Sequence, residues 1–76
     1  MANERLQRHF GRAVRARRER IGLSQEALAD EANVHRTYVS MLERGVSNPT
    51  LSVIFDLAEA LGTTMASLVR EVEESR

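Results

Sequence analysis

The sequence predicts an all-α fold, because apolar residues recur every three or four positions in five successive segments of the 76-residue chain. No segment alternates between apolar and polar residues over the length of a strand. Each segment begins after a residue that caps helices or ends beside a glycine, as helices in proteins commonly do. The length corresponds to one small domain, which hides only about 60% of its unfolded surface and therefore has a thin stability margin.

The first helix is expected over residues 4–20. Phe10 and Val14 belong to an apolar series with spacings of three and four, and Gly22 follows that series, where it can close a helix. The opposite side of this helix is rich in arginine. The apolar side of this helix is expected to cover the core, and its charged side is expected to face solvent.

The second and third helices are expected over about residues 24–32 and 35–44. Ser24 offers a hydroxyl that caps the second helix, and Asn33 and Val34 are left to form the link. So short a link requires a sharp turn. Asn33 is of a residue type that adopts a positive φ readily, and Val34 is expected to fill the space between the two helices.

The third helix leaves a polar face uncovered. Val39 and Leu42 lie three positions apart and are the residues of this helix that are expected to be buried. The opposite side, which we call the polar face, consists of Arg36, Thr37, Ser40, Met41 and Arg44. Such a face is either solvated surface, as most exposed arginines are, or a binding surface.

Two more helices are expected in the C-terminal part, over about residues 51–61 and 65–73. The preceding segment "VSNPT" predicts a loop, because its proline disfavours a helical conformation in the residue before it. Thr50 and Thr64 stand where they can cap the two helices. The final stretch "REVEESR" is expected to fray.

Positive charge is concentrated at the N-terminus, although the formal net charge of the chain is zero. Residues 1–20 hold seven arginines against two glutamates, whereas residues 21–50 and 51–76 both carry a net negative charge. All 11 basic residues are arginine. Arginine suits flat bidentate contacts with phosphate or carboxylate, but its exclusive use is equally consistent with the base composition of the coding DNA.

Several classes of protein are excluded by what the sequence lacks. Without cysteine there is no disulfide framework and no thiolate metal site, and His9 and His35 lie too far apart along the chain to suggest a zinc site. No apolar run reaches the about 18 residues of a membrane span. We therefore expect a cytoplasmic protein with no catalytic residues, metal, cofactor, membrane contact or small-molecule ligand.

Residues 22–62, "GLSQEALADEANVHRTYVSMLERGVSNPTLSVIFDLAEALG", resemble the helix-turn-helix of the Xre family. This family contains lambdoid phage repressors, Cro and the controller proteins of restriction-modification systems. The stretch "HRTYVSMLERG" is especially similar to the controller proteins. Asn33 stands where the family pattern favours glycine. The residues that carry the resemblance are Gln25, the small Ala29, the inward Val39 and Leu42, and the exit "ERG".

The resemblance implies a five-helix, phage-repressor-like DNA-binding domain whose third helix lies in the major groove. Arg36 can then bind guanine O6 and N7 through two parallel hydrogen bonds. Tyr38 has an alternative place against the second helix as part of the core, and Asn48 has an alternative role as a turn former. Base-edge contacts are expected from Arg36, Thr37, Ser40 and Met41, and phosphate contacts from Gln25, His35, Tyr38, Arg44 and Asn48.

The resemblance also implies a structural ion pair and a dimer. Arg18 aligns with the family position that pairs with the glutamate of "ERG", which is Glu43. The last two helices hold more apolar residues than one chain needs, which indicates a homodimer, although these residues are also accounted for if they complete the core of a monomer. The residues expected at the dimer interface are Val53, Phe55, Met65, Leu68, Val69 and Val72.

The predicted function is that of a sequence-specific transcription regulator that binds a palindromic operator in double-stranded DNA as a homodimer, with control of its own promoter as one option. The alternative is an antitoxin or another protein-interaction module built on the same scaffold, with the acidic C-terminal part as its partner surface. An enzyme is not expected, because no carboxylate pair, activated nucleophile or metal cluster is evident in the sequence.

Overall fold

The computed structural model describes residues 3–74, which form five α-helices and no strand. The predicted all-α fold is confirmed, and the helix ends agree with the expected ones to within about one residue, the usual uncertainty of such boundaries. The helices are α1 (Glu4–Arg20), α2 (Gln25–Ala32), α3 (Arg36–Glu43), α4 (Leu51–Ala60) and α5 (Met65–Glu74).

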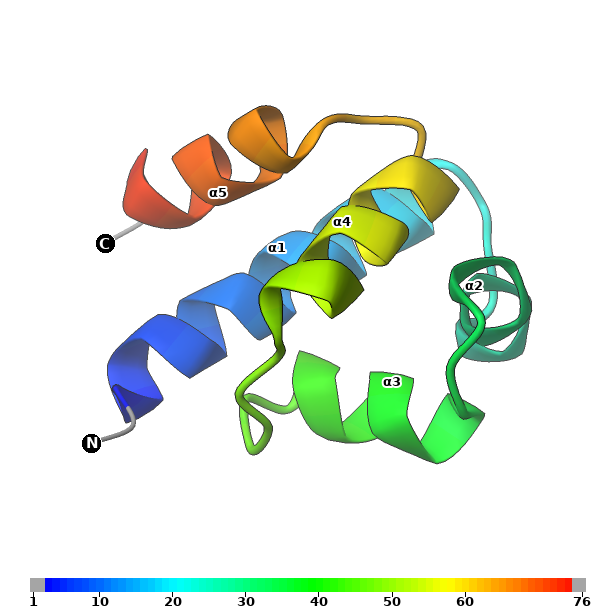
Figure 1. The fold of residues 1–76 in the computed structure, drawn as a ribbon, viewed down its shortest axis with the longest axis horizontal. Helices are drawn as coiled ribbons and strands as arrows, with labels where there is room; N and C mark the ends of the chain where they lie inside the picture. Colours follow the sequence, from blue (N-terminus) through cyan, green and yellow to red (C-terminus); the bar gives the residue numbers. More distant parts are fainter. Residues whose placement is uncertain (1–2, 75–76) are drawn as a thin grey trace.

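The helices surround one apolar core. Figure 1 shows α1 running across the molecule, with α4 lying over it, α3 on one side, α5 on the opposite side and α2 at one end. Every helix sends at least one fully buried side chain into the core. The largest of these side chains are Val14, Leu28, Val39, Leu42, Leu57 and Leu68.

Four of the five helices begin with a side chain that satisfies a free backbone N–H group. Asn3 accepts a hydrogen bond from the amide of Leu6, and Ser24, Thr50 and Thr64 do the same for the amides three residues ahead of them. The helix α3 differs, because its N-cap residue His35 makes no capping hydrogen bond with its side chain. The predicted caps of α2, α4 and α5 are therefore confirmed.

Asn33 makes the turn between α2 and α3 by adopting a left-handed conformation, with φ 58° and ψ 45°. Within residues 3–74 it is the single non-glycine residue with a positive φ. Val34 follows it, packs against the core, and donates its backbone N–H to the carbonyl of Ala29. The turn therefore forms with asparagine at the position where the family pattern favours glycine.

Gly11 brings the backbones of α1 and α3 into direct contact. A Cβ atom built at Gly11 would lie 2.3 Å from the carbonyl oxygen of Leu42 and 2.8 Å from that of Glu43. Both distances are shorter than van der Waals contact, and the atoms that would be met belong to the backbone. Glycine is therefore required where α1 supports the C-terminal end of α3.

Two of the residues that the sequence prediction assigned to a dimer interface are instead buried within their own chain. Leu68 is 0% exposed and Val72 is 3% exposed, because α5 packs both of them into the core of its own chain. An ion pair between Arg17 on α1 and Glu71 on α5 stabilises this packing. The packing of α5 on α1 keeps the chain helical through Glu74. The expectation that the stretch "REVEESR" frays is therefore wrong for residues 70–74. Residues 75–76 lie outside the described part of the chain.

Within residues 3–74, none of the helices has by itself the length and hydropathy needed to cross a membrane. The helices α4 and α5 have the necessary length and hydropathy only when they are counted together, and the chain bends by 101° between them.

We expect Gly11→Ala to destabilise the protein by about 2 kcal/mol, because overpacking against a backbone outweighs the gain of about 1 kcal/mol in helix propensity that alanine brings. Urea denaturation followed by circular dichroism measures the change in the free energy of unfolding. The control is Arg12→Ala, which alters the adjacent exposed residue of α1 and should stay within about 0.5 kcal/mol of the original protein. Equal stabilities for the two variants would mean that α1 and α3 are not in backbone contact.

Candidate nucleic-acid interface

The polar face of α3 points away from the core, as predicted. Val39 and Leu42 are fully buried, which fixes the rotation of the helix about its axis. On the opposite side Arg36, Thr37, Met41 and Arg44 are exposed and Ser40 is half-buried. The structure therefore gathers all five residues of the polar face on one surface.

The residues expected to contact phosphate lie around this face in different environments. His35 is exposed at the start of α3, and Asn48 is exposed in the loop between α3 and α4. Tyr38 is half-buried and packs against the core, so its ring contributes to the fold. Arg44 donates from Nε to the carbonyl oxygen of Ser40, at 3.3 Å, and the rest of its guanidinium faces solvent.

A bidentate ion pair joins α1 to the end of α3. Arg18 donates from Nε to Oε2 of Glu43 at 2.7 Å and from Nη2 to Oε1 at 3.0 Å. Its third donor, Nη1, binds the carbonyl oxygen of Leu23 in the link between α1 and α2, at 2.8 Å. The side chain of Arg18 is 11% exposed and that of Glu43 is 3% exposed, so both charged groups are largely buried and each is the hydrogen-bond partner of the other.

Gln25 belongs to the same network, which the sequence did not indicate. Its amide Nε2 donates to Oε1 of Glu43 at 3.0 Å, so the carboxylate also binds α2. The sequence prediction assigned Gln25 to a phosphate contact alone, whereas the structure gives it a partner within the chain. Its side-chain oxygen and second N–H remain for other partners, because a primary amide has two donors and an acceptor.

The Arg18 guanidinium of this network keeps its charge in the physiological range of pH. The hydrogen bonds to Glu43 raise the pKa of the Arg18 guanidinium above its ordinary value; burial opposes this shift, and the charges of Glu43 and Glu19 add to it. The guanidinium therefore stays charged. The position of α3 relative to α1 is held by hydrogen bonds from this charged guanidinium to Glu43, and its position relative to α2 by the hydrogen bond from Gln25.

We expect Arg18→Met to destabilise the protein by about 3 to 5 kcal/mol, because it leaves the buried Glu43 carboxylate without its counter-charge. Thermal and urea unfolding measure the loss. The double variant Arg18→Met/Glu43→Met should recover a large part of it, since two apolar residues no longer bury a lone charge. A double variant as unstable as the single one would show that the guanidinium stabilises the fold through other contacts.

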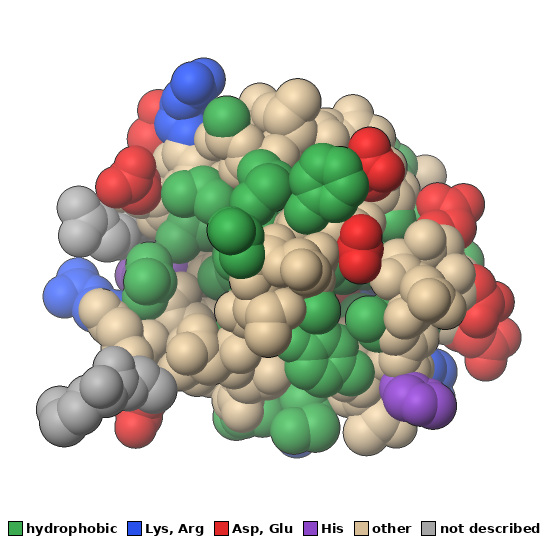
Figure 2. Space-filling view, in the orientation of Figure 1, with side chains coloured by type: hydrophobic (Ala, Val, Ile, Leu, Met, Phe, Trp, Pro, Cys, Tyr) green, Lys and Arg blue, Asp and Glu red, His purple; other side chains and the backbone are tan. Residues whose placement is uncertain are grey.

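The remaining residues predicted at a dimer interface form part of an apolar surface over α4 and α5, which Figure 2 shows as a group of hydrophobic side chains on one face. Phe55 is 48% exposed and Val69 is 41% exposed, while Val53 and Met65 are half-buried. Sequence reasoning missed Leu51, which is 72% exposed on α4. We call the set of Leu51, Val53, Phe55, Met65 and Val69 the apolar surface.

No group of three or more histidine, cysteine, aspartate or glutamate residues is arranged to hold a metal ion within the described part of the chain. The chemistry of the polar face is instead that of hydrogen bonding and charge, from a guanidinium at each end and hydroxyl groups between them.

Comparison with known proteins identifies the arrangement. A model of the helix-turn-helix family matches residues 14–68. The chain is 41% identical over 62 residues to an HTH-type transcriptional regulator of Sinorhizobium fredii, y4dJ, covering 82% of this chain and 79% of the relative. It is 45% identical over 56 residues to control protein C.SmaI of Serratia marcescens, covering 74% of this chain and 67% of the relative.

A solved structure is similar as well. The restriction-modification controller protein C.AhdI of Aeromonas hydrophila superposes with a TM-score of 0.80 and 40% identity, covering 82% of this chain and 94% of that one. The predicted resemblance is thereby confirmed in both sequence and fold. With α2 and α3 as its motif helices and α3 presenting an exposed polar face, the chain belongs to the Xre-like helix-turn-helix family.

Proposed function

We propose that the protein regulates transcription by binding a palindromic operator as a homodimer, with α3 in the major groove. The observation that carries this proposal is the polar face of α3, exposed on a helix that buried contacts hold on its other side. A regulator must present its base-reading side chains on a rigid element, because errors of orientation weaken directional hydrogen bonds. The kinship with transcriptional regulators and controller proteins supports the same function.

The base-edge contacts come from the first two turns of α3. Arg36 is the first residue of the helix, where helix-turn-helix proteins reach base edges, and its free guanidinium matches guanine O6 and N7. Thr37 beside it offers a methyl group to a thymine methyl. Ser40 and Met41 lie one turn further along and read the adjoining base pairs.

Phosphate contacts surround these residues. Gln25 begins α2 and keeps one amide N–H beyond its bond to Glu43, and the exposed side chains of His35, Arg44 and Asn48 carry donors of their own. The hydroxyl of Tyr38 adds a donor at the rim of the core. These contacts fix the orientation of α3 on the duplex without reading its sequence.

The apolar surface is where the second subunit binds. Monomeric proteins rarely leave a ring such as that of Phe55 half exposed beside further large aliphatic side chains. A twofold dimer brings two copies of α3 to successive major grooves about 10 base pairs apart, which requires a palindromic site.

We expect Arg36→Ala to relax the base preference at one position of each half-site, at a cost of about 1 to 3 kcal/mol for the preferred guanine. Selection of bound duplexes from a random pool measures the preference before and after the change. The control is Arg44→Ala, which removes a phosphate donor and should weaken binding to all sequences alike. An unchanged selected motif for Arg36→Ala would assign base reading to other residues.

We expect Phe55→Glu to convert the dimer to a monomer, because the apolar surface would then bury a charge against its twofold copy. Equilibrium sedimentation at micromolar concentration measures the mass. The matched control is Val46→Glu, which places the same charge at a 59% exposed valine outside the apolar surface and should leave the dimer intact. A monomeric original protein would reject the proposed dimer.

A further inference from the structure

Three arginines of α1 form a row and take part in none of the ion pairs of the described chain. Arg5, Arg8 and Arg12 follow one another at spacings of three and four, so they lie on one side of the helix, and all three are exposed. We call these three residues the arginine row. Like charges at such spacings repel each other, so the isolated protein gains nothing from having them together.

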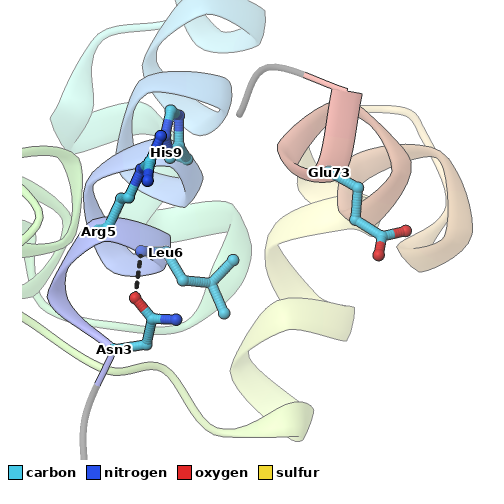
Figure 3. A pocket seen from close by; sticks show the side chains of 5 residues that line it. All are labelled: Asn3, Arg5, Leu6, His9 and Glu73. Atoms are coloured by element: carbon cyan, nitrogen blue, oxygen red, sulfur yellow. Dashed lines mark hydrogen bonds between the residues drawn. The ribbon is translucent and has the colours of Figure 1, made fainter.

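The arginine row forms no ion pair within residues 3–74, although acidic side chains lie in the hollows beside it, Glu4 beside Arg8 and Glu71 beside Arg12. The ion pairs of the described chain join Arg15 to Glu19, Arg17 to Glu71 and Arg18 to Glu43, and none of them involves the arginine row. Glu73 is the acidic residue that lines a pocket together with Arg5, between α1 and α5. Figure 3 shows its carboxylate directed away from Arg5, and the two side chains form no ion pair.

The row lies beside the C-terminal end of the DNA-reading helix. A Cβ atom built at Gly45, just after α3, would lie 2.7 Å from Cγ of Arg8, so the stem of Arg8 packs directly on that residue. Arg8 and Arg44 line the same hollow, together with Gln7 and with Glu4, whose carboxylate is the one negative group there. The polar face therefore continues through Arg44 and Arg8 onto the arginine row.

We infer that the arginine row is a second phosphate-binding surface, which holds the DNA backbone beside the half-site read by α3. This inference rests on the proposed function. At a rise of about 1.5 Å per residue, the row spans about 10 Å. That length matches about three base-pair steps along the duplex axis, at 3.4 Å per step. Guanidinium groups bind phosphate oxygens through paired hydrogen bonds, and such contacts contribute affinity without sequence preference.

An anionic lipid surface offers phosphate too, but the fold favours DNA. Interfacial helices bury an apolar side in the membrane, whereas the apolar side of α1 carries Phe10 and Val14, which are buried in the core. Arg8 in the middle of the arginine row also adjoins the end of the polar face of α3, at Arg44 and Gly45. Through Arg8 the row thus continues the surface proposed to bind DNA.

The test compares the double variant Arg8→Gln/Arg12→Gln with Arg70→Glu. Both lower the net charge by two, but Arg70 is an exposed residue of α5, across the molecule from α3 (Figure 1). The measured quantity is the slope of log affinity against log salt concentration, on the selected operator and on a random duplex. Circular dichroism checks that each variant folds. We expect both to fold, because all three substituted arginines are exposed.

The double variant should lower the magnitude of the slope by about 0.9 for each lost contact, equally on both duplexes, and leave the selected motif unchanged. Arg70→Glu should leave the slope as it was. Equal slopes for all three proteins, or the same change in both variants, would overturn the inference while the proposed function stands. So would binding to phosphatidylserine vesicles that depends on Arg8 and Arg12 while the DNA slope stays constant. Failure of the original protein to select any DNA would instead overturn the proposed function.

Discussion

The buried carboxylate of Glu43 is the interaction on which the position of α3 depends. A charge that is 3% exposed must find its hydrogen bonds within the protein, and Glu43 finds them on two other helices, from Arg18 on α1 and Gln25 on α2. Its partners lie in different directions, so a rotation or a shift of α3 would break at least one of these bonds. Buried ion pairs add little net stability compared with apolar packing, but they do specify geometry, and geometry is what a recognition helix requires.

A steric constraint acts at the same place as this polar one. Gly11 lets the backbone of α1 approach the carbonyl oxygens of Leu42 and Glu43, so the residue that holds the ion pair also rests against the neighbouring helix. Both constraints act on the buried side and the C-terminal end of α3. Its first turn is free of them, and His35 there makes no capping bond with its side chain. Both constraints thus fix the C-terminal end of α3, while the exposed side chains of Arg36 and Thr37 at its N-terminal end are open to a partner.

The sequence was sufficient for the helices and for the polar face, because both follow from local rules. Periodicity showed which side of each helix turns inward, and the capping residues showed where the helices begin. Local rules did not predict contacts between helices, and the one such contact that was predicted, the ion pair of Arg18 with Glu43, came from the family resemblance. Periodicity marks Leu68 and Val72 as apolar but does not say whether their cover comes from the same chain or from a second one. Likewise, the bond from Gln25 to Glu43 and the need for glycine at position 11 depend on where two helices cross, which no local pattern encodes.

The distribution of charge shows how a protein of zero net charge can approach a polyanion in one orientation. Net charge governs the field at long range, whereas within about a Debye length of 8 Å the nearest groups decide. The arginine row and the polar face present guanidinium groups that form no ion pair within the described chain, while the acidic helix α5 lies on the opposite side of α1 from α3 (Figure 1). We therefore expect a polyanion to be attracted to the polar face of α3 and repelled from the acidic end of α5. The apolar surface on α4 and α5 shares no residue with the polar face or the arginine row, so the proposed contacts with DNA and with a second subunit do not compete for the same residues.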